Sequence, residues 1–191
     1  MTEQYLKDFI KLKRSEQQKL KPQIEDIINA HLYGDMKTIA MDFVSYVKDN
    51  FASFKWSGLN TWSARYKSKA LCQITLFVES AAKWGNSYPP NILIILYTNI
   101  NVNESIILKE GLHQIIWDNI FYCVHKINEN KKDLGCSPTK GCAGGSNMTI
   151  LGKDFTGVCK HRVWNVFNPD ETALNSLKKL LCLEKNNGGF L

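Results

Sequence analysis

The sequence predicts an α+β fold with N-terminal helices, a mostly antiparallel sheet, a long helix packed across that sheet and a C-terminal helix. Apolar residues recur every three or four positions through residues 3–50, 111–128 and 170–182, which is the spacing of one helix face. Between residues 54 and 79, apolar and polar residues alternate, as in strands with one covered face. We therefore predict one α+β domain at residues 35–191, preceded by a helical extension at residues 1–34.

Three amphipathic helices are predicted before residue 50. The first spans residues 3–20, the second begins at Pro22 and ends near residue 32, and the third is capped by Asp35. Gly34 supplies the left-handed conformation that often ends a helix. The outer face of the first helix is basic, with Lys7, Lys11 and Arg14. This face is either an ordinary solvated surface or a contact for nucleic acid or a partner protein.

Short strands follow the third helix. The alternation predicts strands at residues 54–57, 61–67 and 71–79, joined by turns at residues 58–60 and 68–69 into an antiparallel meander. Trp62, Ala64 and Tyr66 share one face of the second strand. Residues 92–98 are apolar at nearly every position, so we expect a central strand covered on both faces.

The second half of the chain is predicted to begin with the long helix, from Gly111 to about Asn128. A hairpin at residues 148–159 turns at residues 152–154, and a strand at residues 162–167 follows it. The run Asn168-Pro169-Asp170-Glu171 is typical of a helix start, with Asn168 able to cap and proline at the first helical position.

Composition and motifs exclude several classes of protein. The net charge of +6 comes from lysines spread along the chain, which is poor evidence for a nucleic-acid groove. The N-terminal residues do not resemble a secretory signal, and the apolar run at residues 91–97 is too short to cross a bilayer. We therefore expect a cytoplasmic protein with reduced thiols. The sequence contains no GxxxxGK[ST], GxGxxG, HExxH or GxSxG motif.

The cysteines offer a candidate structural zinc site. Cys136 and Cys142 flank a Gly-rich loop, Cys159 ends the hairpin that follows, and Cys123 lies near the helix end that leads into the loop. Four thiolates at the base of one loop would suit tetrahedral zinc, although no Cys-x2-Cys pair is present. Two alternatives remain open, namely buried core and loop thiols, or a Cys136–Cys142 disulfide. Cys72 and Cys182 lie in apolar contexts, and we interpret them as core residues.

Two further sets of residues are candidates for function. Asp118, Tyr122 and His125 lie four and three residues apart on the predicted long helix, so a carboxylate, a phenol and an imidazole would share one stripe. They are either candidate catalytic residues of an enzyme or an ordinary polar face. The second set is aromatic, and these side chains would either pack in the core or line a small-ligand cleft with a polar rim. It comprises Trp56, Trp62, Arg65, Tyr66 and Trp84.

Several segments together resemble an uncharacterised family of small bacterial proteins from anaerobic Gram-positive bacteria. They are KWSGLNTWSARYKSKALC, EGLHQIIWDNIFYCVH, the Cys/Gly loop, TILGKDFTGVC and FNPDE. The resemblance covers residues 36–182. It implies that the Trp-rich meander and the cysteine loop belong to one domain, and it transfers no catalytic residue.

Overall fold

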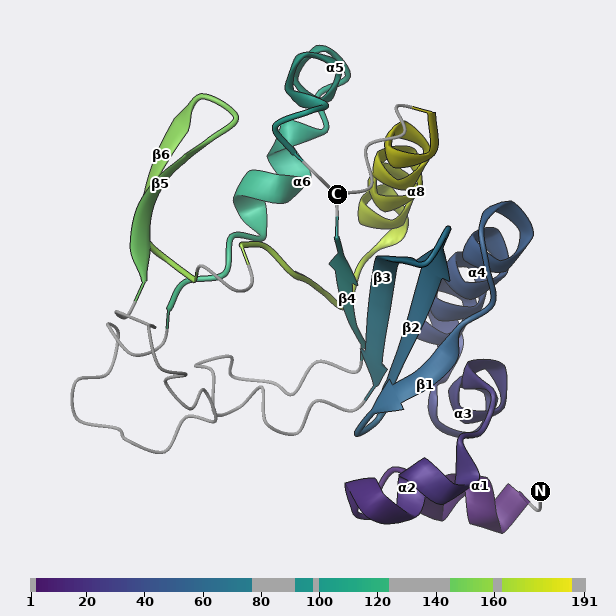
Figure 1. The fold of residues 1–191 in the computed structure, drawn as a ribbon. Helices are drawn as coiled ribbons and strands as arrows, with labels where there is room; N and C mark the ends of the chain where they lie inside the picture. The colour runs from purple at the N-terminus through teal and green to yellow at the C-terminus, as the bar shows by residue number, and fades with distance from the viewer. Residues whose placement is uncertain (1–2, 77–91, 98–99, 124–144, 160–162, 187–191) are drawn as a thin grey trace.

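The computed structural model describes residues 3–76, 92–97, 100–123, 145–159 and 163–186. Its centre is a five-stranded antiparallel sheet with the strand order β1-β2-β3-β4-β7 (Figure 1). With the helices before and after it, this sheet confirms the predicted α+β fold. The strands are β1 (Lys55–Gly58), β2 (Thr61–Tyr66), β3 (Lys69–Leu76), β4 (Ile92–Leu96) and β7 (Val166–Phe167).

The alternation in the sequence sets which residues of the sheet are buried. Trp62 stands opposite Ile74 and Ala64 opposite Cys72, and all four side chains are fully buried. β4 is buried at each of its five positions, as predicted for a strand covered on both faces. It pairs with β3 on one side and β7 on the other, so it lies inside the sheet.

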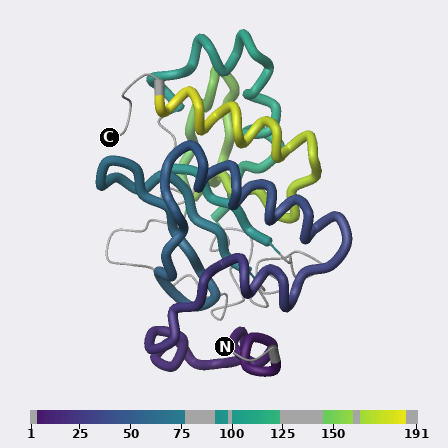
Figure 2. Tube along the Cα trace, turned by 90° about the vertical axis from the view of Figure 1, so that its right-hand side faces the viewer, coloured from purple at the N-terminus to yellow at the C-terminus, as the bar shows by residue number. Residues whose placement is uncertain are grey.

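Helices cover one face of the sheet. Figure 2 shows α4 (Gly34–Asn50) and α8 (Glu171–Asn186) side by side across it, with α3 (Ile24–His31) and the N-terminal helices below. Each helix buries the apolar stripe that its sequence predicts, because the i, i+3, i+4 spacing puts those residues on one face. The buried residues are Ile24, Ile27 and Ile28 of α3, Ala40, Phe43, Val44 and Val47 of α4, and Leu174, Leu177, Leu180 and Leu181 of α8.

The predicted first helix is instead two helices, α1 (Glu3–Phe9) and α2 (Arg14–Leu20). Gln17 explains the break, because its buried amide donates to the backbone carbonyls of Phe9 and Leu12, at 3.1 and 3.3 Å. Those carbonyls therefore have a side-chain partner outside the helix. The basic residues predicted along one helical face are divided between two helices and the turn that joins them.

The predicted long helix at residues 111–128 was wrong for the part that the structure describes. Two short helices, α5 (Glu104–Lys109) and α6 (His113–Asp118), are followed by extended chain. Ile120 pairs with Trp164 and Tyr122 with Val158. Asn119–Cys123 thus form backbone hydrogen bonds with residues 157–159 and 163–165 in place of helical ones. These partners are distant in sequence, so helical periodicity cannot reveal them.

A two-stranded hairpin, β5 (Ser146–Ile150) and β6 (Lys153–Val158), stands apart from the main sheet and packs on α6 (Figure 1). The indole N–H of Trp117 in α6 donates to the carbonyl of Ile150 at 2.9 Å. The hairpin is confirmed, but its turn is Leu151-Gly152. Both residues have positive φ, 50° and 76°, as in the two-residue turns that suit a twisted hairpin.

α8 begins where predicted, but Asp170 caps it. One Asp170 carboxylate oxygen accepts the Ala173 backbone N–H at 2.7 Å. Asn168 instead joins β4, because its side-chain oxygen accepts the Ile92 backbone N–H at 3.0 Å. This contact fixes the start of α8 against the end of the sheet.

The N-terminal helices contribute to the main core. Phe9 is fully buried, and its ring lies 6.1 Å from that of Trp62 in the sheet. The predicted division of the chain at residue 34 stays a prediction. Within the described residues, no helix combines the length and apolarity needed to span a bilayer.

Candidate ligand-binding groove and cysteine pair

Helices α4 and α8 lie parallel, with their N-terminal ends at the same side of the molecule (Figure 2). Three contacts show how α4 and α8 are aligned. Lys178 Nζ lies 2.6 Å from Asp42 Oδ2, Tyr46 Oη 3.1 Å from the Lys178 carbonyl, and Lys185 Nζ 3.1 Å from the Asn50 carbonyl. The step of eight residues from Asp42 to Asn50 on α4 is matched by the step of seven from Lys178 to Lys185 on α8, so the helices run in the same direction side by side over two turns.

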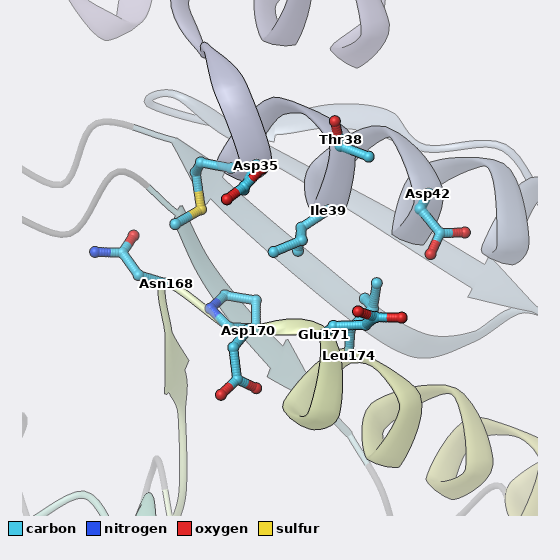
Figure 3. A pocket seen from close by; sticks show the side chains of 10 residues that line it. Asp35, Thr38, Ile39, Asp42, Asn168, Asp170, Glu171 and Leu174 are labelled. Carbon is cyan, nitrogen blue, oxygen red and sulfur yellow. The ribbon is translucent and has the colours of Figure 1, made fainter.

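A groove of about 540 Å³ opens between the N-terminal halves of these two helices. Figure 3 shows Asp35, Ile39 and Asp42 on the side of α4 that faces α8. The turn between β7 and α8 closes the opposite wall. The lining residues are Asp35, Met36, Thr38, Ile39, Asp42, Asn168, Pro169, Asp170, Glu171 and Leu174. The volume lies within the range of small-molecule sites, about 300–1,000 Å³.

The groove combines an apolar base with an acidic rim. Met36, Ile39 and Leu174 supply aliphatic surface between the helices. Asp35 and Glu171 lie in the first turns of α4 and α8, where the positive end of each helix dipole stabilises a carboxylate. These helix ends therefore hold several acidic groups close together at little electrostatic cost.

The carboxylates of the rim have different partners. The Asp170 carboxylate points away from α4 and caps α8 (Figure 3). Asp42 pairs with Lys178, whose side chain is only 19% exposed and whose ammonium also lies 5.3 Å from the centre of the Tyr46 ring. Asp35 and Glu171 make no ion pair within the described part of the chain, so they are the carboxylates open to a ligand.

The four described members of the predicted aromatic set have separate surroundings. Trp62 is fully buried and its indole N–H donates to the Pro22 carbonyl at 2.9 Å. Tyr66 packs edge-on against Phe51. Arg65 points to the opposite face of β2 and donates to the Ser68 carbonyl at 3.1 Å. Trp56 is half-buried beside Gln17, and Trp84 lies outside the described residues.

The predicted stripe comprised Asp118, Tyr122 and His125. In the described part of the chain, no helix extends from Asp118 to Tyr122. α6 ends at Asp118, whose carboxylate accepts the Gln114 amide at 2.6 Å. Tyr122 is exposed on the extended segment, and His125 lies outside the described residues. Asp118 and Tyr122 therefore do not share one face of a helix.

Two of the four candidate zinc ligands are neighbours. Tyr122 pairs with Val158, the Cys123 N–H donates to the Gly157 carbonyl at 2.7 Å, and the Cys159 N–H donates to the Phe121 carbonyl at 2.8 Å. Cys123 and Cys159 thus sit diagonally across one antiparallel pair, on the same face, and both are buried. Cys136 and Cys142 lie outside the described residues.

The other two cysteines differ from each other. Cys72 is a fully buried core residue, as predicted, and burial raises the pKa of its thiol far above its ordinary value. Cys182 is only partly buried, and its sulfur lies 2.8 Å from the Tyr46 hydroxyl. Burial, followed by this contact, raises the pKa of Tyr46.

Comparison of the chain with protein-family models, curated proteins and solved structures gives no match. The resemblance to a bacterial family therefore stays a prediction. The fold and the groove define an α+β domain with a ligand-sized site between two parallel helices. Sequence reasoning missed this site because its two walls are more than 120 residues apart and no motif joins them.

Proposed function

We propose that this protein is a small-ligand-binding α+β domain whose site is the groove between α4 and α8. The observation that carries the proposal is a cavity of about 540 Å³ with an aliphatic base between two carboxylates that have no cationic partner in the described chain. Apolar surface with a few well-placed polar groups is the usual make-up of a small-molecule site.

The chemistry of the groove favours an organic cation with an apolar body. An ammonium group would pair with Asp35 and Glu171, while an alkyl chain would cover Ile39 and Leu174. An anion would meet the same carboxylates and be repelled. A neutral ligand would gain only the apolar contact.

Titration with heptylamine, heptanol and heptanoate tests the proposal, with binding followed by chemical-shift changes of the backbone amides. We expect heptylamine to bind most tightly, with a Kd of about 1 mM, and to shift amides of α4 and α8 around the groove. Joint substitution of Asp35→Asn and Glu171→Gln should weaken binding about fivefold. Asp49→Asn, at the exposed far end of α4, is the matched control and should leave binding unchanged. Equal binding of heptanoate, or shifts only outside the groove, would contradict the proposal.

A second function is favoured by the Cys123–Cys159 pair, namely a structural zinc that closes the cysteine loop. Diagonal neighbours stand about 7–8 Å apart between Cα atoms, which exceeds the reach of most disulfides. The same spacing suits two thiolates on one zinc, because Zn–S bonds of about 2.3 Å put the sulfurs roughly 3.8 Å apart.

The ends of the segment 124–144 support the same proposal. A Cβ atom built on Gly145 would lie 2.9 Å from Cys123 Cβ, so the chain enters and leaves this segment at one place. Cys142 is three residues from Gly145, and three residues of chain span at most about 11 Å. We therefore propose Cys142 as a third zinc ligand beside Cys123 and Cys159.

Metal analysis tests the zinc proposal on protein purified without an affinity metal. We expect about one zinc per chain, reduced to well below half in Cys123→Ala and in Cys159→Ala. Cys182→Ala is the control and should retain the metal. A folded wild-type protein without zinc would end this proposal and leave the groove proposal untouched.

A further inference from the structure

The Lys178 side chain pairs with Asp42, one of the acidic residues that line the α4–α8 groove. Its ammonium lies 2.6 Å from Asp42 and 5.3 Å from the centre of the Tyr46 ring, and the side chain is 19% exposed. Asp42 is 51% exposed and lines the groove, so the ion pair with Lys178 does not cover its carboxylate completely. A protein cation is thus already bound at one of the acidic positions.

Asp35 and Asp42 are seven residues apart on α4, which places them on the same helix face and about 10 Å apart along the axis. Ile39 lies between them (Figure 3). Without Lys178, α4 would therefore present two carboxylates at the ends of an aliphatic strip. This arrangement matches a linear diamine whose nitrogens are a similar distance apart.

We infer that Lys178 determines the specificity of the groove by acting as a built-in substitute for a second ligand ammonium. The groove then selects amines with one cationic end, because Asp42 is neutralised by the protein itself. This inference rests on the proposed function and adds to it the charge and length of the preferred ligand. Lys178 is a specificity-determining residue whose effect reaches the ligand through Asp42.

The test compares heptylamine, 1,7-diaminoheptane and 1,3-diaminopropane on wild-type protein and on Lys178→Gln. The wild-type protein should bind the two seven-carbon amines within about twofold of each other. In Lys178→Gln, the affinity for 1,7-diaminoheptane divided by that for heptylamine should be about fivefold higher than in the wild-type protein. A change of about fivefold corresponds to one exposed ion pair, here between the second ammonium and Asp42. 1,3-Diaminopropane, which is too short to join Asp35 to Asp42, should gain nothing comparable.

Two further variants separate this effect from general charge and from damage to the fold. Lys179→Gln removes an exposed lysine from the next position of α8 and should leave the ratio of affinities unchanged. Asp42→Asn in the Lys178→Gln background should abolish the gain for the diamine. Circular dichroism checks that each variant is folded, and Lys178→Met replaces Lys178→Gln if the latter is not.

The outcomes separate the two proposals. If wild-type protein binds heptylamine in the groove but Lys178→Gln leaves the ratio unchanged, the role of Lys178 is wrong and the groove function stands. If the ratio rises equally in Lys179→Gln, the effect is general charge and the inference fails. If no amine binds any variant, the proposed function fails and the inference fails with it.

Discussion

Gln17 is a polar residue at the centre of the contact between the N-terminal helices and the sheet. Its side chain is fully buried, accepts the Asn60 backbone N–H at 2.8 Å and donates to the Asn60 side-chain oxygen at 2.6 Å. It also donates to the carbonyls of Phe9 and Leu12. One amide of α2 therefore satisfies polar groups of α1, of the turn between α1 and α2, and of the turn between β1 and β2.

Gln17→Ala should lower the free energy of unfolding by about 2–4 kcal/mol, because it leaves several buried polar groups without partners. Urea unfolding followed by circular dichroism measures the change. Gln18→Ala, at the exposed neighbouring position, is the control and should change stability by less than about 0.5 kcal/mol. Equal effects at both positions would mean that the buried network contributes nothing specific.

The burial of Cys72 predicts that the free energy of unfolding decreases at alkaline pH. Burial raises the pKa of its thiol in the folded protein, so folding favours the protonated form. The resulting stabilisation is fully present below the unfolded pKa of about 8.5 and is lost as the pH rises above it. The loss should reach about 2 kcal/mol at pH 10.

The measurement is the free energy of unfolding at pH 7 and pH 10 for the wild-type protein and for Cys72→Ala. The variant is less stable at pH 7 because it leaves a small cavity, but its further loss at pH 10 should be about 2 kcal/mol smaller. The same loss in both proteins would show that Cys72 does not contribute to the alkaline decrease.

At the scale of secondary-structure elements, periodicity predicted most helices and strands but not residues 119–123. Ile116, Ile120 and Cys123 fit a helical stripe, yet Ile120 and Cys123 are also buried in an extended chain. The choice between the two conformations is made by hydrogen bonds to Gly157 and Val163, more than 30 residues away. Local sequence does not contain that information, so the helical spacing of Asp118 and Tyr122 was predicted with the long helix and is absent with it.

Gly145, just before β5, lies very close to the backbone of Gly157 and to the side chain of Cys123. A Cβ atom there would lie 2.8 Å from the Gly157 carbonyl oxygen and 2.9 Å from Cys123 Cβ, and φ is +73°. Gly152, in the hairpin turn, has φ of +76° with nothing within 4 Å of its Cβ position. The two glycines therefore share a backbone conformation and differ in the space around them.

Gly152→Ala should cost about 1–2 kcal/mol, the penalty for a left-handed alanine. Gly145→Ala should cost at least about 1 kcal/mol more, because the backbones of residues 145 and 157 must also separate. Urea unfolding of both variants gives the comparison. If the zinc proposal holds, Gly145→Ala should also lower the zinc content, while Gly152→Ala should not. Equal costs would show that the close approach relaxes freely.

At the scale of the whole molecule, the groove depends on elements from both ends of the chain. α4 carries one wall, and α8, which follows β7 at the edge of the sheet, carries the other. The sequence predicted both helices and the start of α8 from the run Asn168-Pro169-Asp170-Glu171. It did not predict that they lie parallel, because that follows from the strand order and from contacts such as Asp42–Lys178.

The same core includes the N-terminal helices, so the whole described chain should unfold in one transition. Phe9 packs against Trp62, Ile24 and Ile27 are fully buried, and one apolar cluster extends from Phe9 to Leu181. Phe9→Ala should lower the free energy of unfolding by about 3–5 kcal/mol. Tyr5→Ala, at a half-buried position of the same helix, should cost less than half as much.

Tryptophan fluorescence and far-ultraviolet circular dichroism, measured together in urea, show whether that loss is global. The described tryptophans all lie outside α1–α4, so fluorescence reports on the sheet and the second half of the chain, while circular dichroism reports mainly on the helices. Coincident transitions therefore mean one cooperative unit. In Phe9→Ala both curves should move to lower urea together, because the side chain bridges helix and sheet. A helical transition that precedes the fluorescence change in the wild-type protein would instead mean that residues 1–34 form a separable extension. In that case the sheet, α4 and α8 would hold the groove without the N-terminal helices.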